Sequence, residues 1–128
     1  MITLDALTDV TYEVDRGLAT ITINRPERFN AFRARTVDEL IFCVKSAWAA
    51  SDVGVLCLTG AGDRAFCAGG DQKQRAETGD YGPSENGLFE VDTLHRVLRE
   101  IPKPVIAAVN GFAIGGGHVL HGLTPAPA

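Results

Sequence analysis

Hydrophobic and polar residues alternate in two neighbouring stretches near the start of the chain. Residues 10–14 read Val-Thr-Tyr-Glu-Val and residues 18–23 read Leu-Ala-Thr-Ile-Thr-Ile, with Asp-Arg-Gly between them. A period of two on either side of turn residues predicts a β-hairpin with one buried face. The Asn-Arg-Pro at 24–26 ends the second strand, because proline has no N–H for a strand ladder.

Two further stretches carry apolar residues at helical spacing, three and four positions apart, which predicts two amphipathic helices. The first stripe consists of Val37, Leu40, Ile41, Val44 and Trp48, and the second of Val91, Leu94, Val97, Leu98 and Ile101. Thr36 is expected to cap the first helix, because Glu39 follows it in capping-box spacing. Pro102 and Pro104 are expected to end the second helix.

Residues 53–58 and 105–109 are nearly continuous apolar runs, typical of strands that are covered on both faces. Their alternation with the helices predicts an α/β fold, with parallel strands joined by right-handed crossovers. A glycine-rich segment follows each run, at 60–70 and at 110–117. Folds of this class bind ligands at the carboxyl ends of parallel strands, so both segments are candidate binding loops.

The composition fits one globular domain, with 128 residues of which 45% are hydrophobic and 22% charged. A net charge of −4 argues against a nucleic-acid partner. No apolar stretch approaches the roughly 20 residues of a membrane helix, and the N-terminus lacks signal-peptide features. The three cysteines, Cys43, Cys57 and Cys67, indicate free thiols in a reducing cytoplasm, and no residue pattern indicates a metal site.

The two glycine segments allow three interpretations. Two backbone N–H groups from different loops are the minimal oxyanion hole, which stabilises negative charge on a carbonyl oxygen. The glycines are alternatively needed only for tight turns. Residues 60–65 also fit the G-x-G-x-x-A dinucleotide fingerprint, but that motif requires a helix to open at the glycines, and the next glycine pair, at 69–70, leaves no room for one.

Three motifs resemble the crotonase (enoyl-CoA hydratase/isomerase) superfamily. They are Ile-Asn-Arg-Pro at 23–26 with Asn-Ala-Phe at 30–32, Ala-Phe-Cys-Ala-Gly-Gly-Asp at 65–71, and Pro-Lys-Pro-Val-Ile-Ala at 102–107 with Asn-Gly-Phe-Ala-Ile-Gly-Gly-Gly at 110–117. The resemblance implies a crotonase-like spiral of ββα turns, with residues 1–121 forming the N-terminal half of an acyl-CoA-binding domain. Residues 122–128 depart from the family and are expected to be an irregular tail, as after a truncation or a shifted reading frame.

The resemblance also implies roles for individual residues. Gly70 and Gly116 take the positions of the two catalytic residues whose N–H groups form the oxyanion hole for a thioester enolate. Arg28 or Lys73 is expected either to meet CoA phosphates or simply to be solvated. The positions implied to contact substrate or CoA are Phe29, Ala31, Ala68, Gly69, Asp71, Gln72, Tyr81, Phe112 and Gly115.

Within the family, the residues at 69–73 and 117–121 resemble 1,4-dihydroxy-2-naphthoyl-CoA synthase of menaquinone biosynthesis, a lyase that closes a ring. The short loop at 79–87 is nearer to 2-ketocyclohexanecarboxyl-CoA hydrolase, which opens one. Val119 stands where hydratases of the family have a glutamate, which argues against hydration by the usual route. A non-catalytic binding or interaction module is the remaining alternative.

The family resemblance defines the expected partners as well. The substrate is a small-molecule CoA thioester, no cofactor is expected to be tightly bound, and bicarbonate is a candidate base because some synthases of this type use it. Members of the family assemble as homotrimers or hexamers. Neither a nucleic acid nor a membrane is expected as a partner.

Overall fold

A five-stranded sheet with strand order β1-β2-β3-β5-β7 is the centre of the computed structural model, which describes residues 2–70, 91–113 and 126–127. The strands are β1 (Val10–Asp15), β2 (Leu18–Ile23), β3 (Val55–Gly60), β5 (Val105–Ala108) and β7 (Ala126–Pro127). β2, β3 and β5 run parallel, with β3 in the middle. The predicted α/β class and the predicted central strand are therefore confirmed.

The hairpin at the start of the chain is also confirmed. β1 pairs antiparallel with β2, so that Val10 lies opposite Ile23. Along β2 the buried residues are Ala19, Ile21 and Ile23, whereas Leu18 is exposed. The period of two in the sequence therefore corresponds to one face of β2 that is packed into the core.

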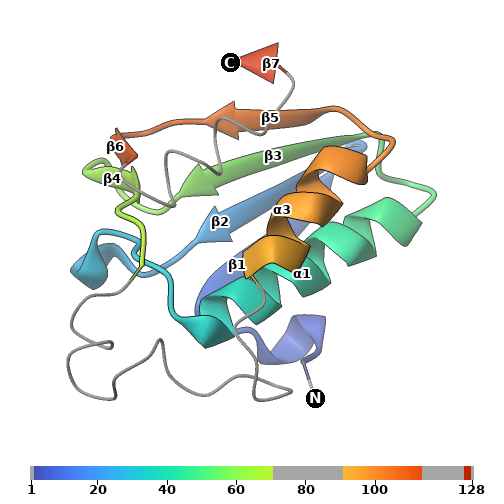
Figure 1. The fold of residues 1–128 in the computed structure, drawn as a ribbon. Helices are drawn as coiled ribbons and strands as arrows, with labels where there is room; N and C mark the ends of the chain where they lie inside the picture. The colour runs from blue at the N-terminus through green and yellow to red at the C-terminus, as the bar shows by residue number, and fades with distance from the viewer. Residues whose placement is uncertain (1, 71–90, 114–125, 128) are drawn as a thin grey trace.

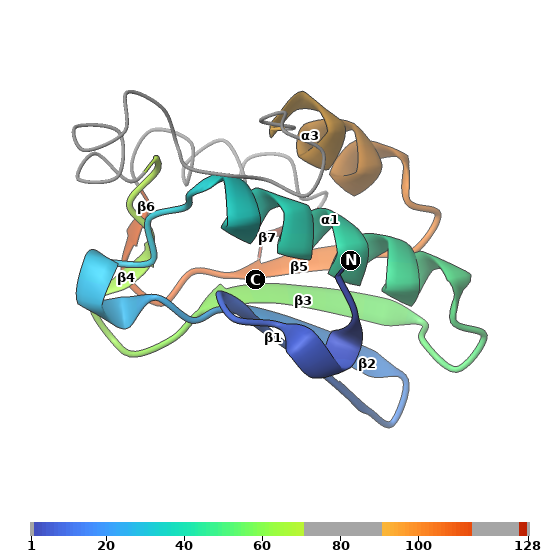
Figure 2. The same ribbon diagram turned by 90° about the horizontal axis from the view of Figure 1, so that it is seen from below.

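Helices α1 (Ala34–Ala49) and α3 (Val91–Glu100) lie side by side on one face of the sheet (Figures 1 and 2). Their apolar stripes join the inward residues of β2, β3 and β5 in one hydrophobic core. The assignment of Trp48 to the first stripe is wrong, because its exposed fraction is 37%. Ala47, which is fully buried, occupies the inward position of the last turn instead.

β7 is a departure from the irregular tail expected at 122–128. Ala126 and Pro127 pair in parallel with Ile106 and Ala107 of β5, at the edge of the sheet. An edge position tolerates proline, because an edge strand leaves one row of backbone groups outside the ladder. Residues 122–125 and 128 lie outside the described part of the chain.

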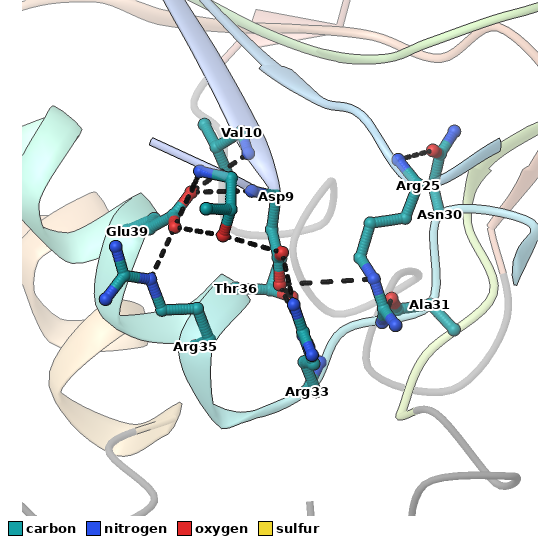
Figure 3. Close-up of polar contacts among 10 residues, drawn as sticks. Asp9, Val10, Arg25, Asn30, Ala31, Arg33, Arg35, Thr36 and Glu39 are labelled. Carbon is teal, nitrogen blue, oxygen red and sulfur yellow. Dashed lines mark hydrogen bonds and ion pairs between the residues drawn. The ribbon is translucent and has the colours of Figure 1, made fainter. Parts of the chain in front are cut away.

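A buried polar network joins the start of β1 to the start of α1 (Figure 3). The Asp9 carboxylate accepts hydrogen bonds from Nε and Nη2 of Arg33, both 2.8 Å long, and from the Thr36 hydroxyl at 2.7 Å. The fully buried Glu39 carboxylate accepts hydrogen bonds of 2.9 to 3.1 Å from the backbone amides of residues 8–10. These bonds compensate the desolvation of two buried carboxylates.

This network explains why the predicted cap of α1 is wrong. The N-cap is Arg33, and Thr36 is the third residue of the helix, where its hydroxyl accepts a hydrogen bond of 3.1 Å from the Arg33 amide. The Glu39 carboxylate takes no part in the cap, because it binds the backbone amides of residues 8–10 and the Arg35 side chain. The local cap is therefore formed three residues earlier than predicted, by Arg33 and Thr36.

The fold is expected to lose part of its stability in acid through Asp9. Burial acts to raise the pKa of Asp9, but hydrogen bonds from Arg33, Thr36 and Thr8 together with the Arg33 charge outweigh it and lower the pKa from 3.8 to about 2. A carboxyl group with a lowered folded-state pKa stabilises the fold above its unfolded pKa, and this contribution is lost as pH falls from about 4 to about 2. Asp9→Asn is therefore expected to lower the free energy of unfolding by about 2 kcal/mol at pH 7.

Urea denaturation at a series of pH values measures this effect. The gap between the native chain and the variant is expected to shrink as pH falls below 4, because the native carboxyl then becomes neutral too. Asp15→Asn is the matched control, since the Asp15 side chain is 83% exposed. A gap of constant size down to pH 2 would contradict the prediction.

The C-terminal end of α1 is stabilised by a lysine from a distant part of the chain. Lys103 Nζ donates hydrogen bonds to the carbonyl oxygens of Ala47 at 2.6 Å and Ala50 at 2.7 Å. Lys103→Met keeps most of the stem and removes both bonds, so the free energy of unfolding is expected to fall by about 1.5 to 3 kcal/mol. Urea denaturation tests this, with the exposed Lys45→Met as control, and an equal effect of both substitutions would argue against the cap.

Candidate functional site

Three segments meet at the edge of the sheet where β2, β3 and β5 end. The first contains the 3-10 helix η2 (Pro26–Arg28), the second contains β4 (Ala65–Cys67), and the third leads into β6 (Phe112–Ala113). β4 and β6 pair in parallel as a small second sheet beyond the carboxyl ends of the long strands (Figure 1). This is the edge at which parallel sheets bind ligands.

Asn30 joins the first of these segments to the second. Asn30 and Phe29 both have left-handed backbone conformations, with φ of 56° and 53°, and asparagine adopts this region more readily than most residues. The buried Asn30 side chain accepts a hydrogen bond from the Arg25 amide at 2.9 Å. Its Nδ2 donates to the carbonyl oxygens of Ala61 at 3.0 Å and Ala65 at 2.8 Å. One side chain thus holds both ends of the turn between β3 and β4.

Asn110 joins the third segment to the same turn. Its Oδ1 accepts a hydrogen bond of 3.2 Å from the Gly60 amide, and its Nδ2 donates to the carbonyl oxygens of Gly62 at 2.9 Å and Ala65 at 3.0 Å. The Ala65 carbonyl oxygen therefore accepts from two asparagines that lie 80 positions apart in the sequence, at 30 and 110. All three segments are connected through this one atom.

Two glycines allow the backbones to approach this closely. A Cβ atom on Gly111 would collide with the backbone of Arg64 and lie 2.8 Å from the Ala65 nitrogen. A Cβ atom on Gly60 would lie 2.7 Å from both the Ala65 oxygen and Asn30 Nδ2. Since side chains do not tolerate such distances, glycine is required at both positions by packing.

The first two segments also pair directly through their backbones. The Ala68 amide donates to the Phe29 carbonyl at 3.1 Å, and the Phe32 amide donates to the Gly69 carbonyl at 2.7 Å. Phe32 and Gly70 form a parallel bridge. Gly69 has a φ of 90°, which favours glycine. The glycine-rich segment at 60–70 is therefore fixed to the segment that follows β2.

These contacts bring together several residues that the sequence implicated. Phe29, Ala68, Gly69 and Gly70 are neighbours at this edge, and the backbone of Phe112 lies opposite Ala65. Ala31 lies on the same segment, but its side chain is buried and only 7% exposed, so it offers little surface to a ligand. The predicted positions outside the described residues are Asp71, Gln72, Lys73, Tyr81, Gly115 and Gly116.

A small pocket of about 90 Å³ opens beside Phe29 and is lined by residues 61–65 with Pro26 and Asn30. Phe29 is 45% exposed there, and the Arg64 guanidinium carbon lies 5.9 Å from its ring centroid. This distance is at the outer limit of a cation–π contact. Arg64 is not among the residues that the sequence implicated, because spacing along the chain does not show that β4 approaches Phe29.

Other chemistries find no support among the described residues. Burial raises the pKa of the Cys67 thiol to about 11, although a backbone hydrogen bond at Gly69 acts to lower it, so the thiol is protonated at neutral pH and is a poor nucleophile. Within residues 2–70, 91–113 and 126–127, no cluster of three His, Cys, Asp or Glu could hold a metal. The helices of this part of the chain are too short or too polar to span a bilayer.

Comparisons with known proteins agree with this arrangement. Residues 13–124 match the sequence profile of the enoyl-CoA hydratase/isomerase family. An enoyl-CoA hydratase from Bacillus anthracis is 30% identical, with a TM-score of 0.82 over 94% of this chain and 46% of that one. A carnitinyl-CoA dehydratase from Mycobacterium avium is 35% identical, with a TM-score of 0.80 over 93% and 46%. A Pseudomonas aeruginosa protein is 30% identical, with a TM-score of 0.84 over 95% and 52%.

The chain therefore spans about half the length of these solved structures. The dinucleotide interpretation of residues 60–65 is wrong, because the segment from Gly60 to Gly70 contains β4 and no helix. The fold is crotonase-like, as the motifs implied. The profile match and the similarity to these structures show that the chain belongs to the enoyl-CoA hydratase/isomerase family.

Proposed function

We propose that this chain carries the thioester-binding part of an acyl-CoA enzyme, in which the N–H groups of Gly70 and Gly116 stabilise an enolate. The observation that carries this proposal is the parallel pairing of β4 with β6. Cys67 of β4 lies opposite Ala113 of β6, and each of the two glycines comes three positions after its paired residue. Two segments of the chain that continue from a parallel strand pair, over the same number of residues, bring such amides toward the same pocket.

The chemistry follows from the charge that develops on the substrate. Removing a proton or breaking a carbon–carbon bond next to a thioester places negative charge on the carbonyl oxygen. Backbone N–H groups fixed around that oxygen stabilise the transition state more than the neutral substrate. Loss of one such donor typically costs about 10²–10³ in rate. A CoA thioester is the proposed substrate class, with bicarbonate as a candidate base.

The proposed reaction is ring closure of the 1,4-dihydroxy-2-naphthoyl-CoA synthase type, by an intramolecular Claisen condensation of succinylbenzoyl-CoA. The enolate carbon next to the thioester bonds to the carboxyl carbon on the aromatic ring, a C–O bond of that carboxyl group breaks, and water leaves. The sequences at 69–73 and 117–121 support it. Two of the similar structures are named as a hydratase and a dehydratase. Val119, however, has no titratable group with which to activate water at the position where hydratases of the family have a glutamate. This difference favours a reaction in which the enolate attacks carbon instead.

Ring opening of the 2-ketocyclohexanecarboxyl-CoA hydrolase type is the second candidate. The short segment at 79–87 and the Asn-Ala-Phe-Arg at 30–33 favour it. It is the reverse type of step and uses the same stabilised enolate, so the two glycine amides would serve either reaction. For both reactions, we propose that the residues implicated by the family motifs contact CoA. We also propose that the protein assembles as a trimer or hexamer, as the family does.

Turnover assays test the proposal directly. The protein is expected to convert succinylbenzoyl-CoA to the naphthoyl thioester, followed by absorbance. Gly116→Pro removes one amide hydrogen and is expected to lower kcat by about 10²–10³-fold. Gly116→Ala keeps the amide hydrogen and serves as the matched control, and circular dichroism checks that both variants fold.

Each result has a defined meaning. An unchanged rate in Gly116→Pro would overturn the oxyanion hole. Faster opening of 2-ketocyclohexanecarboxyl-CoA than closure of the synthase substrate would select the second candidate, and faster hydration of crotonyl-CoA would contradict both. Binding of the thioester without turnover of any substrate would indicate a non-catalytic binding module.

A further inference from the structure

We infer that Asn110 is a positioning residue, which sets the register between the two chain segments that lead to Gly70 and Gly116. This inference rests on the proposed function, because it assigns the register a role in thioester chemistry. It concerns how the two amides are held at a fixed separation. The described residues at the base of both segments carry it.

The pairing of β4 with β6 is short and irregular. Ala65 lies opposite Phe112, but Cys67 lies opposite Ala113, so the register shifts by one residue between the two pairs. The extra residue is Phe66, whose side chain is fully buried. Such bulges re-aim a strand next to a functional site. Counted along the sequence from the pair Cys67 and Ala113, Gly70 and Gly116 are equivalent positions. Without the shift, Gly70 would be equivalent to the position after Gly116.

A pair of strands this short does not fix its own register. β6 has two residues, and strands without a long hydrogen-bonded ladder are prone to slip. Asn110 supplies the missing constraint from the start of the third segment. Its Nδ2 reaches the Ala65 carbonyl at 3.0 Å, directly before the bulge, and its Oδ1 accepts from the Gly60 amide at 3.2 Å. The side chain thus links the end of β3, the first residue of β4 and the start of β6.

Asn30 supports the same atom from the opposite side. Its Nδ2 donates to the Ala65 carbonyl at 2.8 Å, so the oxygen is held by two amides at once. Gly111, immediately after Asn110, packs against the Arg64–Ala65 backbone with no room for a Cβ atom. A slip of one residue would displace β6 by about 3.3 Å. Misplacement of even about 1 Å in a catalytic arrangement can cost on the order of 10² in rate.

The test compares Asn110→Ala with Thr59→Val in the same protein. Thr59 is a matched control, because its hydroxyl donates a hydrogen bond of 2.8 Å to the Ala108 carbonyl and so links β3 to β5 rather than β4 to β6. Two readouts are used, namely kcat and KM for the CoA thioester that the native protein turns over, and hydrogen exchange at the Cys67 and Ala113 amides. The second readout needs no substrate.

Asn110→Ala is expected to lower kcat by about 10²-fold with KM changed less than about threefold, because binding contacts remain while the two amides lose their alignment. Exchange at Cys67 and Ala113 is expected to accelerate at least about tenfold. Thr59→Val is expected to lower the midpoint of thermal unfolding about as much as Asn110→Ala does. It is expected to change neither kcat nor hydrogen exchange at Cys67 and Ala113. Asn110→Asp, which keeps the acceptor and loses both donors, is expected to behave like Asn110→Ala.

Several outcomes would overturn the inference. It fails if Asn110→Ala leaves exchange at both amides unchanged, or if Thr59→Val has the same effect on kcat. It also fails if exchange accelerates while kcat stays constant, because register would then have no part in catalysis. A native protein without thioester turnover overturns the proposed function and the catalytic role together, whereas unchanged exchange in the variant overturns the register alone.

Asn30→Gly provides a second variant that tolerates the left-handed backbone at this position. It removes the other donor to the Ala65 carbonyl. If both asparagines act through that one atom, the double variant with Asn110→Ala is expected to lose less activity than the product of the two single losses. Losses that simply multiply would contradict a shared point of action.

Discussion

The Ala65 carbonyl oxygen is the atom on which the arrangement of this edge depends. It accepts from Asn30 at 2.8 Å and from Asn110 at 3.0 Å, and these side chains come from the segments after β2 and β5. β4 itself follows β3, so one acceptor unites the ends of all three parallel strands. A carbonyl oxygen has two lone pairs, and both are used here. The glycines at 60 and 111 are required because the backbones must approach closely enough for these bonds to form.

The buried polar network around Asp9 also stabilises the edge of the sheet at which β2, β3 and β5 end. Asp9 binds Arg33 at the start of α1 and lies 4.0 Å from Arg25 Nε, and the Arg25 guanidinium also donates to the Ala31 carbonyl (Figure 3). Arg25 therefore connects the start of β1 to the segment that carries Phe29. That segment pairs in turn with the backbone of Ala68 and Gly69. The N-terminal network and the glycine segment at 60–70 are consequently linked through an ion pair and a series of hydrogen bonds.

Periodicity along the chain was sufficient to predict the hairpin, the parallel strands and both helices, because each buries one regular face. It failed where long-range contacts override local preference. Thr36 and Glu39 have the spacing of a cap, yet the Thr36 hydroxyl binds the Asp9 carboxylate and the Glu39 carboxylate binds the amides of residues 8–10, all 27 or more positions away. β4 and β6 escaped prediction because their few residues carry no period of their own. The sequence also gave no sign that Phe66 is the extra residue of a register shift, since a shift is a property of two strands.

The candidate site, like the fold, was predicted only in part from the sequence. Family motifs pointed to the glycines. The same motifs contain Asn30 and Asn110, but the sequence did not show that both side chains bind the Ala65 carbonyl oxygen. Because the proposed hole uses backbone N–H groups, it would recognise the oxygen of any thioester. The fold that carries it is shared with solved structures named as a hydratase and a dehydratase. If the reactions share a hole of backbone amides, the side chains around it must distinguish them. In the sequence, Val119 in place of the glutamate of the family's hydratases is such a difference, because valine cannot activate water, and the proposed preference for ring closure rests on it.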